Sequence, residues 1–156
     1  MIHWYLCKAS SSYGLDADGS TTMQALVRAY SHAEAERLLQ EEITEHYPDC
    51  AQYIDVVSVV RRKVEEVVQQ HFESSVSAAY YWVKLDYREE GELGKETTRR
   101  LLYLVEATDT YDVLESMKAL YPVGAGLEDV VSVQRSPIDT IIEREIAPAE
   151  VKVYKD

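Results

Sequence analysis

The sequence YPDCAQYIDVVSVVR at residues 47–61 returns as YPVGAGLEDVVSVQR at residues 121–135, which is 74 positions later. Nine of the fifteen aligned positions are identical, whereas unrelated stretches of this length would share about one. Similarity of a chain to itself at a fixed spacing is the signature of an internal repeat. The stretch therefore predicts a tandem duplication within the 156 residues.

The repeat extends from this stretch in both directions, with small changes of spacing. Upstream, Leu26–Ala29 aligns with Leu104–Ala107 at a spacing of 78, and Lys8 aligns with Lys84 at a spacing of 76. Downstream the spacing stays at 74, which aligns Val64, Val67 and Val68 with Ile138, Ile141 and Ile142. The change from 78 to 74 removes four residues, about one helical turn, from the second helix, so the buried face of that helix is kept.

Each half predicts the order strand, strand, helix, strand. The expected strands are residues 3–9, 22–30 and 55–61 in the first half, and 80–87, 98–107 and 129–135 in the second. Acidic turns with a glycine, at 16–19 and 89–92, separate the first two strands, because such turns supply the positive φ that hairpins need. Valine-rich strands fit poorly into helices. We predict that the third strands are central and covered on both faces.

Both predicted helices begin with the same capping pattern. Ser31 precedes Glu34, and Asp109 precedes Asp112, so a side-chain acceptor stands three residues before an acid. Apolar residues follow at helical spacing in both halves, namely Ala35, Leu38, Leu39 and Ile43, then Val113, Leu114, Met117 and Leu120. These stripes predict amphipathic helices that each bury one face. Each helix is expected to end at Tyr-Pro.

The predicted fold class is α+β, a tandem duplication of a β-β-α-β unit with mainly antiparallel sheet and helices on one face. The first repeat spans residues 1–68 and the second spans residues 80–142. Residues 69–79 connect them. Residues 143–156 form a C-terminal tail, in which Val151–Tyr154 could add an edge strand.

Charge and composition exclude several classes of partner. The net charge is −12, and nucleic-acid affinity comes mostly from lysines and arginines that displace counterions. We therefore expect no binding to nucleic acid at physiological salt. The apolar runs fall short of the ~18 residues that a membrane span requires, and the N-terminus does not resemble a signal peptide. Cys7 and Cys50 lack the spacing of a disulfide framework, so two reduced thiols and a cytoplasmic location are expected.

The motifs that could carry chemistry are weak. On a strand, His3 and Cys7 would lie about 13 Å apart, too far to share a metal ion. His46 and Cys50 could approach each other but supply only two ligands. Asp16–Gly19 resembles half of a calcium loop, and Gly124–Gly126 runs from helix to strand, the wrong order for a phosphate loop.

Candidate nucleophiles and acids are equally unspecific. Ser58 and Ser132 lie within predicted strands among valines, with no nucleophile elbow. The carboxylate pairs Glu41-Glu42, Glu65-Glu66 and Glu89-Glu90 are adjacent in sequence, so their side chains are expected to diverge into solvent. We therefore predict no catalytic residues, no cofactor-binding or metal-binding residues, no cofactor, and a protein that is not an enzyme.

Several segments together resemble a known family. They are Trp4-Tyr5 followed by Lys8, Leu26–Ala29 leading into Ser31–Glu36, and Ser136–Asp139. This pattern is similar to an uncharacterised family of short, acidic bacterial and phage proteins, the domain-of-unknown-function family 4494, over most of residues 3–142. The family has no established activity, so the resemblance implies no catalytic or ligand-binding residues. It implies a cytoplasmic bacterial or phage-borne protein.

Three hypotheses for the function remain open at this point. The leading one is a non-catalytic cytoplasmic interaction or regulatory protein with an unidentified protein partner. The second is an acidic regulator of a basic protein, such as one that binds nucleic acid. The third is a small-ligand sensor or enzyme with a pocket at the seam between the repeats. No membrane partner is expected, and a homodimer is compatible with all three.

Overall fold

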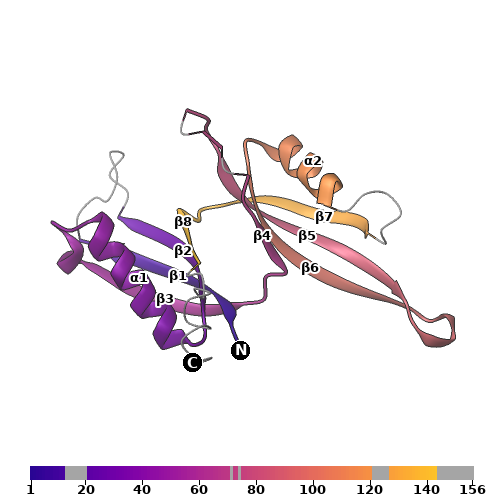
Figure 1. Cartoon of the computed structure of the whole chain (residues 1–156), viewed down its shortest axis with the longest axis horizontal. Helices are drawn as coiled ribbons and strands as arrows, with labels where there is room; N and C mark the ends of the chain where they lie inside the picture. The colour runs from indigo at the N-terminus through magenta and orange to yellow at the C-terminus, as the bar shows by residue number, and fades with distance from the viewer. Residues whose placement is uncertain (13–20, 71, 74, 121–126, 144–156) are drawn as a thin grey trace, which may run out of the picture. The chain divides into compact units, whose positions relative to one another are not determined.

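A computed structural model describes residues 1–12, 21–70, 72–73, 75–120 and 127–143, with the side chains at 89–90 and 127–129 excluded. Over these residues the protein has two α-helices and eight strands in two mostly antiparallel sheets (Figure 1). The predicted α+β class is therefore confirmed. The tandem duplication stays a prediction, although the two sheets can be compared strand by strand.

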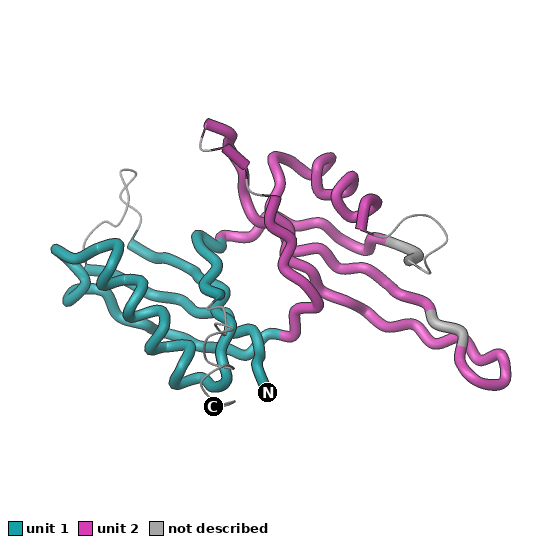
Figure 2. The backbone as a smooth tube through the Cα atoms, viewed as in Figure 1, with its two compact units in different colours: residues 1–62, 138–156 teal, residues 63–137 magenta. Residues whose placement is uncertain are grey.

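The chain divides into two compact units (Figure 2). Unit 1 comprises residues 1–62 and 138–156, and unit 2 comprises residues 63–137. Each predicted repeat was one continuous segment of the chain, whereas unit 1 combines two separate segments. This arrangement arises because two short strands, described below, each complete a sheet built from a distant part of the chain.

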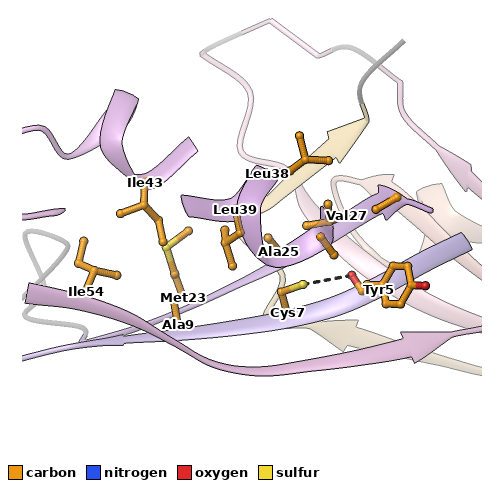
Figure 3. Close-up of a cluster of buried hydrophobic side chains, with 12 residues drawn as sticks. Tyr5, Cys7, Ala9, Met23, Ala25, Val27, Leu38, Leu39, Ile43 and Ile54 are labelled. Atoms are coloured by element: carbon orange, nitrogen blue, oxygen red, sulfur yellow. Dashed lines mark hydrogen bonds between the residues drawn. The ribbon is translucent and has the colours of Figure 1, made fainter. Parts of the chain in front are cut away.

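In unit 1 the sheet has the order β3-β1-β2-β8. Its elements are β1 (His3–Ser11), β2 (Thr22–Ala29), α1 (His32–His46), a 3-10 turn (Ala51–Tyr53), β3 (Ile54–Arg62) and β8 (Thr140–Glu143). Helix α1 packs on one face of β1, β2 and β3. Alternate residues of β1 and β2 face this helix, where Cys7, Ala25 and Leu39 are fully buried (Figure 3).

In unit 2 the sheet has the order β4-β6-β5-β7. Its elements are β4 (Glu66–Val68), β5 (Ala79–Glu90), a 3-10 turn (Glu92–Gly94), β6 (Glu96–Ala107), α2 (Thr110–Leu120) and β7 (Leu127–Ser136). Helix α2 packs on β6. The core below it comprises Tyr81, Val83, Leu85, Tyr103, Val105, Ala107, Val113 and Met117.

Strand register follows the spacings that were read from the sequence. In unit 1, Leu6 pairs with Leu26 on one side and Val60 on the other. In unit 2 the residues at the corresponding positions, Trp82, Leu104 and Gln134, pair in the same way. The bulge between Lys8 and Ala9 also has an equivalent between Lys84 and Leu85.

The short strands β4 and β8 extend this correspondence but were not predicted. Each adds in parallel to the second strand of a sheet, with Val67 opposite Leu104 and Ile141 opposite Leu26. Residues 64–68 follow the third strand of unit 1 but belong to unit 2, and residues 138–143 follow the third strand of unit 2 but belong to unit 1. Each sheet therefore receives its fourth strand from the segment that follows the third strand of the other sheet.

The prediction that the third strands are central is wrong. Both β3 and β7 lie at an end of their sheet. Val57 is 60% exposed and Val131 is 43% exposed, and both lie at the bulges described above. A bulge leaves one residue without a cross-strand partner. The continuous valine run therefore marks an irregular edge strand, which hinders pairing with another chain.

Helix starts agree with the sequence in both units. The Ser31 hydroxyl accepts from the Glu34 amide at 3.1 Å, and the Glu34 carboxylate accepts from the Tyr30 amide at 3.2 Å. In unit 2, Asp109 accepts from the Asp112 amide at 2.8 Å. The buried stripe of α1 is confirmed at Ala35, Leu38, Leu39 and Ile43. In α2 only Val113 and Met117 are buried, whereas Leu114 and Leu120 are exposed. Leu114 lies about 100° around the helix from Val113, and Leu120 is the last residue of the helix.

Candidate functional site

Two adjoining cavities in unit 1 form a concave surface in the part of the chain that the structure describes. The first has a volume of about 320 Å³ and is lined by Leu38, Glu41, Glu42, Glu45, Ile141, Ile142 and Glu143. The second has a volume of about 230 Å³ and is lined by Met23, Glu42, His46, Tyr47, Asp139 and Thr140. Both lie between α1 and β8, and Glu42 lines both. We call the two together the acidic groove.

The helical side of the groove comes from the last two turns of α1. Residues Glu41, Glu42 and Glu45 lie within one turn of each other, and residues three or four apart share a helix face. Adjacent Glu41 and Glu42 were predicted to diverge into solvent, yet both line the first cavity. Adjacent helix residues point in different directions, but both glutamate side chains are long enough to reach the same cavity.

The strand side of the groove is held by hydrogen bonds between β2 and the segment that leads into β8. The Asp139 amide donates to the Gln24 carbonyl at 2.9 Å, and the Gln24 amide donates to the Asp139 carboxylate at 2.9 Å. At the other end of β8, Arg28 pairs with Glu143 at 2.6 Å. Both side chains of this pair are about 40% exposed, so the pair orders the rim more than it stabilises the fold.

His46 lines the second cavity and lies beside two carboxylates of the groove. Its Nε2 atom is 3.4 Å from Oε1 of Glu42, an i,i+4 pair on α1. Potential ligand atoms of Glu42, Glu45 and His46 all lie within 4.8 Å of one another. They belong to one helix turn, and Glu45 and His46 are exposed. The arrangement can attract a cation electrostatically, and the negative end of the helix dipole adds to this attraction.

The cysteines do not join this cluster. Cys50, which the sequence set four residues after His46, lies outside the group formed by Glu42, Glu45 and His46. Cys7 is fully buried in the core of unit 1, with its Sγ atom 3.8 Å from the Tyr5 carbonyl (Figure 3). Burial, with a smaller contribution from Glu36, raises the pKa of the Cys7 thiol to about 11. Both cysteines are free thiols.

The remaining candidates from the sequence lie apart from the groove. Ser58 is half-buried opposite Lys8, and Ser132 is exposed opposite Lys84. Glu65 and Glu66 are exposed in unit 2. Desolvation and the nearby Arg61 guanidinium lower the pKa of His3. Three motifs lie outside the described residues: the loops Asp16–Gly19 and Gly124–Gly126, and the side chains of Glu89-Glu90.

A family profile described as a domain of unknown function (DUF4494) matches residues 3–144. The chain belongs to this family. The match spans both units and includes β8, so the acidic groove lies within the DUF4494 region. Among curated proteins, none matches the chain. No helix in the part of the chain that is described is long and apolar enough to cross a membrane.

Sequence reasoning did not find the acidic groove. It treated the glutamates of α1 as a solvated helix face and did not recognise residues 140–143 as a strand. One signal was available: the first helix was predicted to be one turn longer than the second. The extra turn carries Glu45 and His46, which have no counterpart in the second helix.

Proposed function

We propose that this member of the DUF4494 family is a non-catalytic cytoplasmic interaction protein, and that its acidic groove binds a lysine- or arginine-rich segment of a partner protein. The proposal combines an interaction module with the regulation of a basic protein. The observation that carries it is the gathering of five carboxylates, from Glu41, Glu42, Glu45, Asp139 and Glu143, around two adjoining cavities.

The charge balance of the groove supports a cationic ligand. Arg37 pairs with Glu41 and Arg28 pairs with Glu143, each at 2.6 Å. The side chain of Glu45 makes no hydrogen bond or ion pair with a described residue, and that of Glu42 lies 3.4 Å from the His46 imidazole. The groove therefore keeps an excess of negative charge, and the net charge of −12 adds a long-range attraction for cations.

The shape and exposure of the groove favour a peptide segment over a small substrate. Its carboxylates lie at the rim, where solvent screens each ion pair, so several weak contacts along a segment must add up to useful affinity. Leu38, Ile141 and Ile142 supply apolar surface between the acids. Such a mixed lining suits a lysine side chain, whose carbon chain contacts apolar groups while its ammonium group stays near water.

A direct test measures binding of a labelled peptide of alternating serine and lysine by fluorescence anisotropy. The double variant Glu42→Gln with Glu45→Gln removes two groove carboxylates. The control Glu65→Gln with Glu66→Gln removes two exposed carboxylates from unit 2 and changes the net charge equally. We expect the groove variant to lose about tenfold in affinity and the control less than about twofold, since close charges dominate at physiological salt.

The outcomes separate the proposal from non-specific attraction. Binding that weakens equally in both double variants would show that overall charge, rather than the groove, holds the peptide. Absence of binding at physiological salt would contradict the proposal outright. A peptide with glutamine in place of lysine controls for contacts that do not depend on charge.

A further inference from the structure

Strand β8 lines both cavities of the acidic groove. This strand pairs in parallel with β2 through one of its edges, from Ala25 opposite Thr140 to Arg28 opposite Glu143. Among the described strands it is the last one in its sheet. A strand presents backbone N–H and C=O groups along both edges, so the second edge of β8 offers hydrogen-bonding groups to a further strand.

Helix α1 and strand β8 run in opposite directions along the two sides of the groove. The C-terminal end of α1, at His46 and Tyr47, shares the second cavity with Asp139 and Thr140, which lie at the start of β8. Leu38, more than two turns earlier in α1, shares the first cavity with Glu143, at the end of β8. An exposed sheet edge is a place where extended peptides add as strands, and β8 is the outermost described strand of its sheet.

Resting on the proposed function, we propose that the partner segment binds as an extended strand added antiparallel to β8. Antiparallel pairing is slightly more stable per residue than parallel pairing. A strand in this orientation runs in the same direction as α1. The residues on its helix-facing side therefore meet Leu38 first, then Glu42, then Glu45.

The spacing of strand and helix then specifies the sequence of the segment. From Leu38 to Glu45 the helix advances by about 10.5 Å, at 1.5 Å per residue. Every second residue of a strand faces the same side, and four strand residues span about 13 Å. The flexible side chain of lysine covers the difference of ~3 Å. The segment is thus predicted to read Val-x-Lys-x-Lys from N- to C-terminus, with valine against Leu38 and the lysines against Glu42 and Glu45.

The first experiment tests direction. It compares Ser-Val-Thr-Lys-Thr-Lys-Ser with the reversed sequence Ser-Lys-Thr-Lys-Thr-Val-Ser, both labelled, acetylated and amidated, on the full chain. The two have the same composition and charge, so an electrostatic groove alone would bind them equally. We expect the forward peptide to bind at least about tenfold more tightly, since only it places the apolar residue at Leu38. Equal affinities would overturn the proposed orientation and motif.

The second experiment tests strand pairing itself. Backbone N-methylation is introduced in the forward peptide either at the valine and both lysines or at the two threonines. In an added strand these two sets of N–H groups point to opposite edges, and only one set faces β8. We expect one set to lose about tenfold in affinity and the other to retain it. Equal behaviour of the two methylated peptides, whether both bind or both fail, would overturn strand addition.

Failure of this inference is distinguishable from failure of the proposed function. If both directions and both methylated sets bind alike, and Glu42→Gln with Glu45→Gln weakens all of them, the groove binds basic peptides without strand pairing. In that case the proposed function stands and strand addition is wrong. If no lysine peptide binds at physiological salt, the proposed function fails, and strand addition fails with it.

Discussion

Helices α1 and α2 each follow the second strand of a sheet, and the two sheets have the same strand order, but α1 has 15 residues and α2 has 11. At a spacing of 78, the last residue of α2, Leu120, corresponds to Glu42, so residues 43–46 are an additional turn of α1. Glu41 corresponds to Ala119. Of the groove residues, Glu45 and His46 therefore lie in the turn by which the helices differ. The groove depends on this longer helix together with β8.

In the corresponding region of unit 2, hydrogen bonds from a glutamine side chain hold helix α2 to its sheet. Gln70, two residues beyond β4, donates from Nε2 to the Ser116 hydroxyl at 2.7 Å and to the Glu106 carbonyl at 2.9 Å. Its backbone amide donates to the Glu106 carboxylate at 3.1 Å. The amide group thus joins α2, β6 and the segment after β4. Position 144, the counterpart of Gln70, lies outside the described residues.

The comparison shows that the same arrangement of strands and helix carries different side-chain interactions in the two units. In unit 2 polar contacts tie the helix to its neighbours, whereas in unit 1 charged side chains line an opening of about 320 Å³. Carboxylates gathered at an opening repel one another and contribute little to stability. A surface that does not stabilise the fold is a reasonable place to find function.

The largest expected effect is a difference in unfolding free energy between substitutions in the covered core of unit 1 and at its exposed edge strand β3. Leu39 is fully buried on the sheet-facing side of α1, whereas Val57 is 60% exposed at the β3 bulge. Leu39→Asp should lower the free energy of unfolding by at least about 3 kcal/mol, because it places an unpaired charge in the core. Val57→Asp should change it by less than about 1 kcal/mol. Chemical denaturation measures both, and equal losses would show that the open edge is covered.

The next effect tests the hydrogen bonds of the Gln70 side chain in unit 2. Gln70→Ala removes the hydrogen bonds to Ser116 and Glu106, and we expect a loss of about 1–3 kcal/mol because partly buried acceptors are left unsatisfied. Its neighbour Gln69 is exposed, and its side chain donates to the Tyr80 hydroxyl at 3.3 Å. Gln69→Ala should cost less than about 0.5 kcal/mol. Similar urea midpoints for the two variants would show that the hydrogen bonds of Gln70 do not stabilise the fold.

A smaller effect should be equal in the two units, because the helix caps are the feature they share most closely. Ser31→Ala and Asp109→Ala each remove the acceptor for an amide of the first helical turn. Each should cost about 1 kcal/mol. The measurement is thermal or urea unfolding of the single variants and the double variant. A cap that matters in only one unit would show that the helices depend differently on their first turns.

Local signals in the sequence predicted the features that local physics determines. The caps at Ser31 and Asp109 and the buried stripe of α1 follow from residues three or four apart, and the four-residue difference in helix length follows from the repeat spacing. Such interactions form within a single helix and need no knowledge of the rest of the fold.

Features that depend on distant pairing were missed. Strands β4 and β8 have three and four residues, and β8 is fixed by contacts such as Gln24 with Asp139, 115 residues apart. No local period distinguishes so short a strand from a loop. The valines of β3 predicted burial on both faces, because hydrophobicity alone does not indicate which strand lies at an edge. The groove depends on β8, so the sequence alone did not reveal it.

The effect that is smallest at neutral pH concerns Cys7, whose counterpart in unit 2 at a spacing of 76 is Val83; both are fully buried. Burial raises the pKa of the Cys7 thiol from its ordinary 9.0 to about 11. Between these values the unfolded chain loses the proton while the folded chain keeps it, so stability falls as the pH rises from about 9 to about 11 and is unaffected by this group below about 9.

Cys7→Val gives unit 1 the residue found in unit 2 and removes this group. The difference in unfolding free energy between wild type and variant should be constant from about pH 7 to 8.5 and should then shift in favour of the variant as the pH rises further. Tyrosine ionisation affects both proteins alike, so the comparison isolates the thiol. Native wild-type protein should also react with a thiol reagent at Cys50 before Cys7, since the buried group stays protonated. Parallel stability curves, together with rapid modification of Cys7, would show that the face of β1 below α1 opens readily to water.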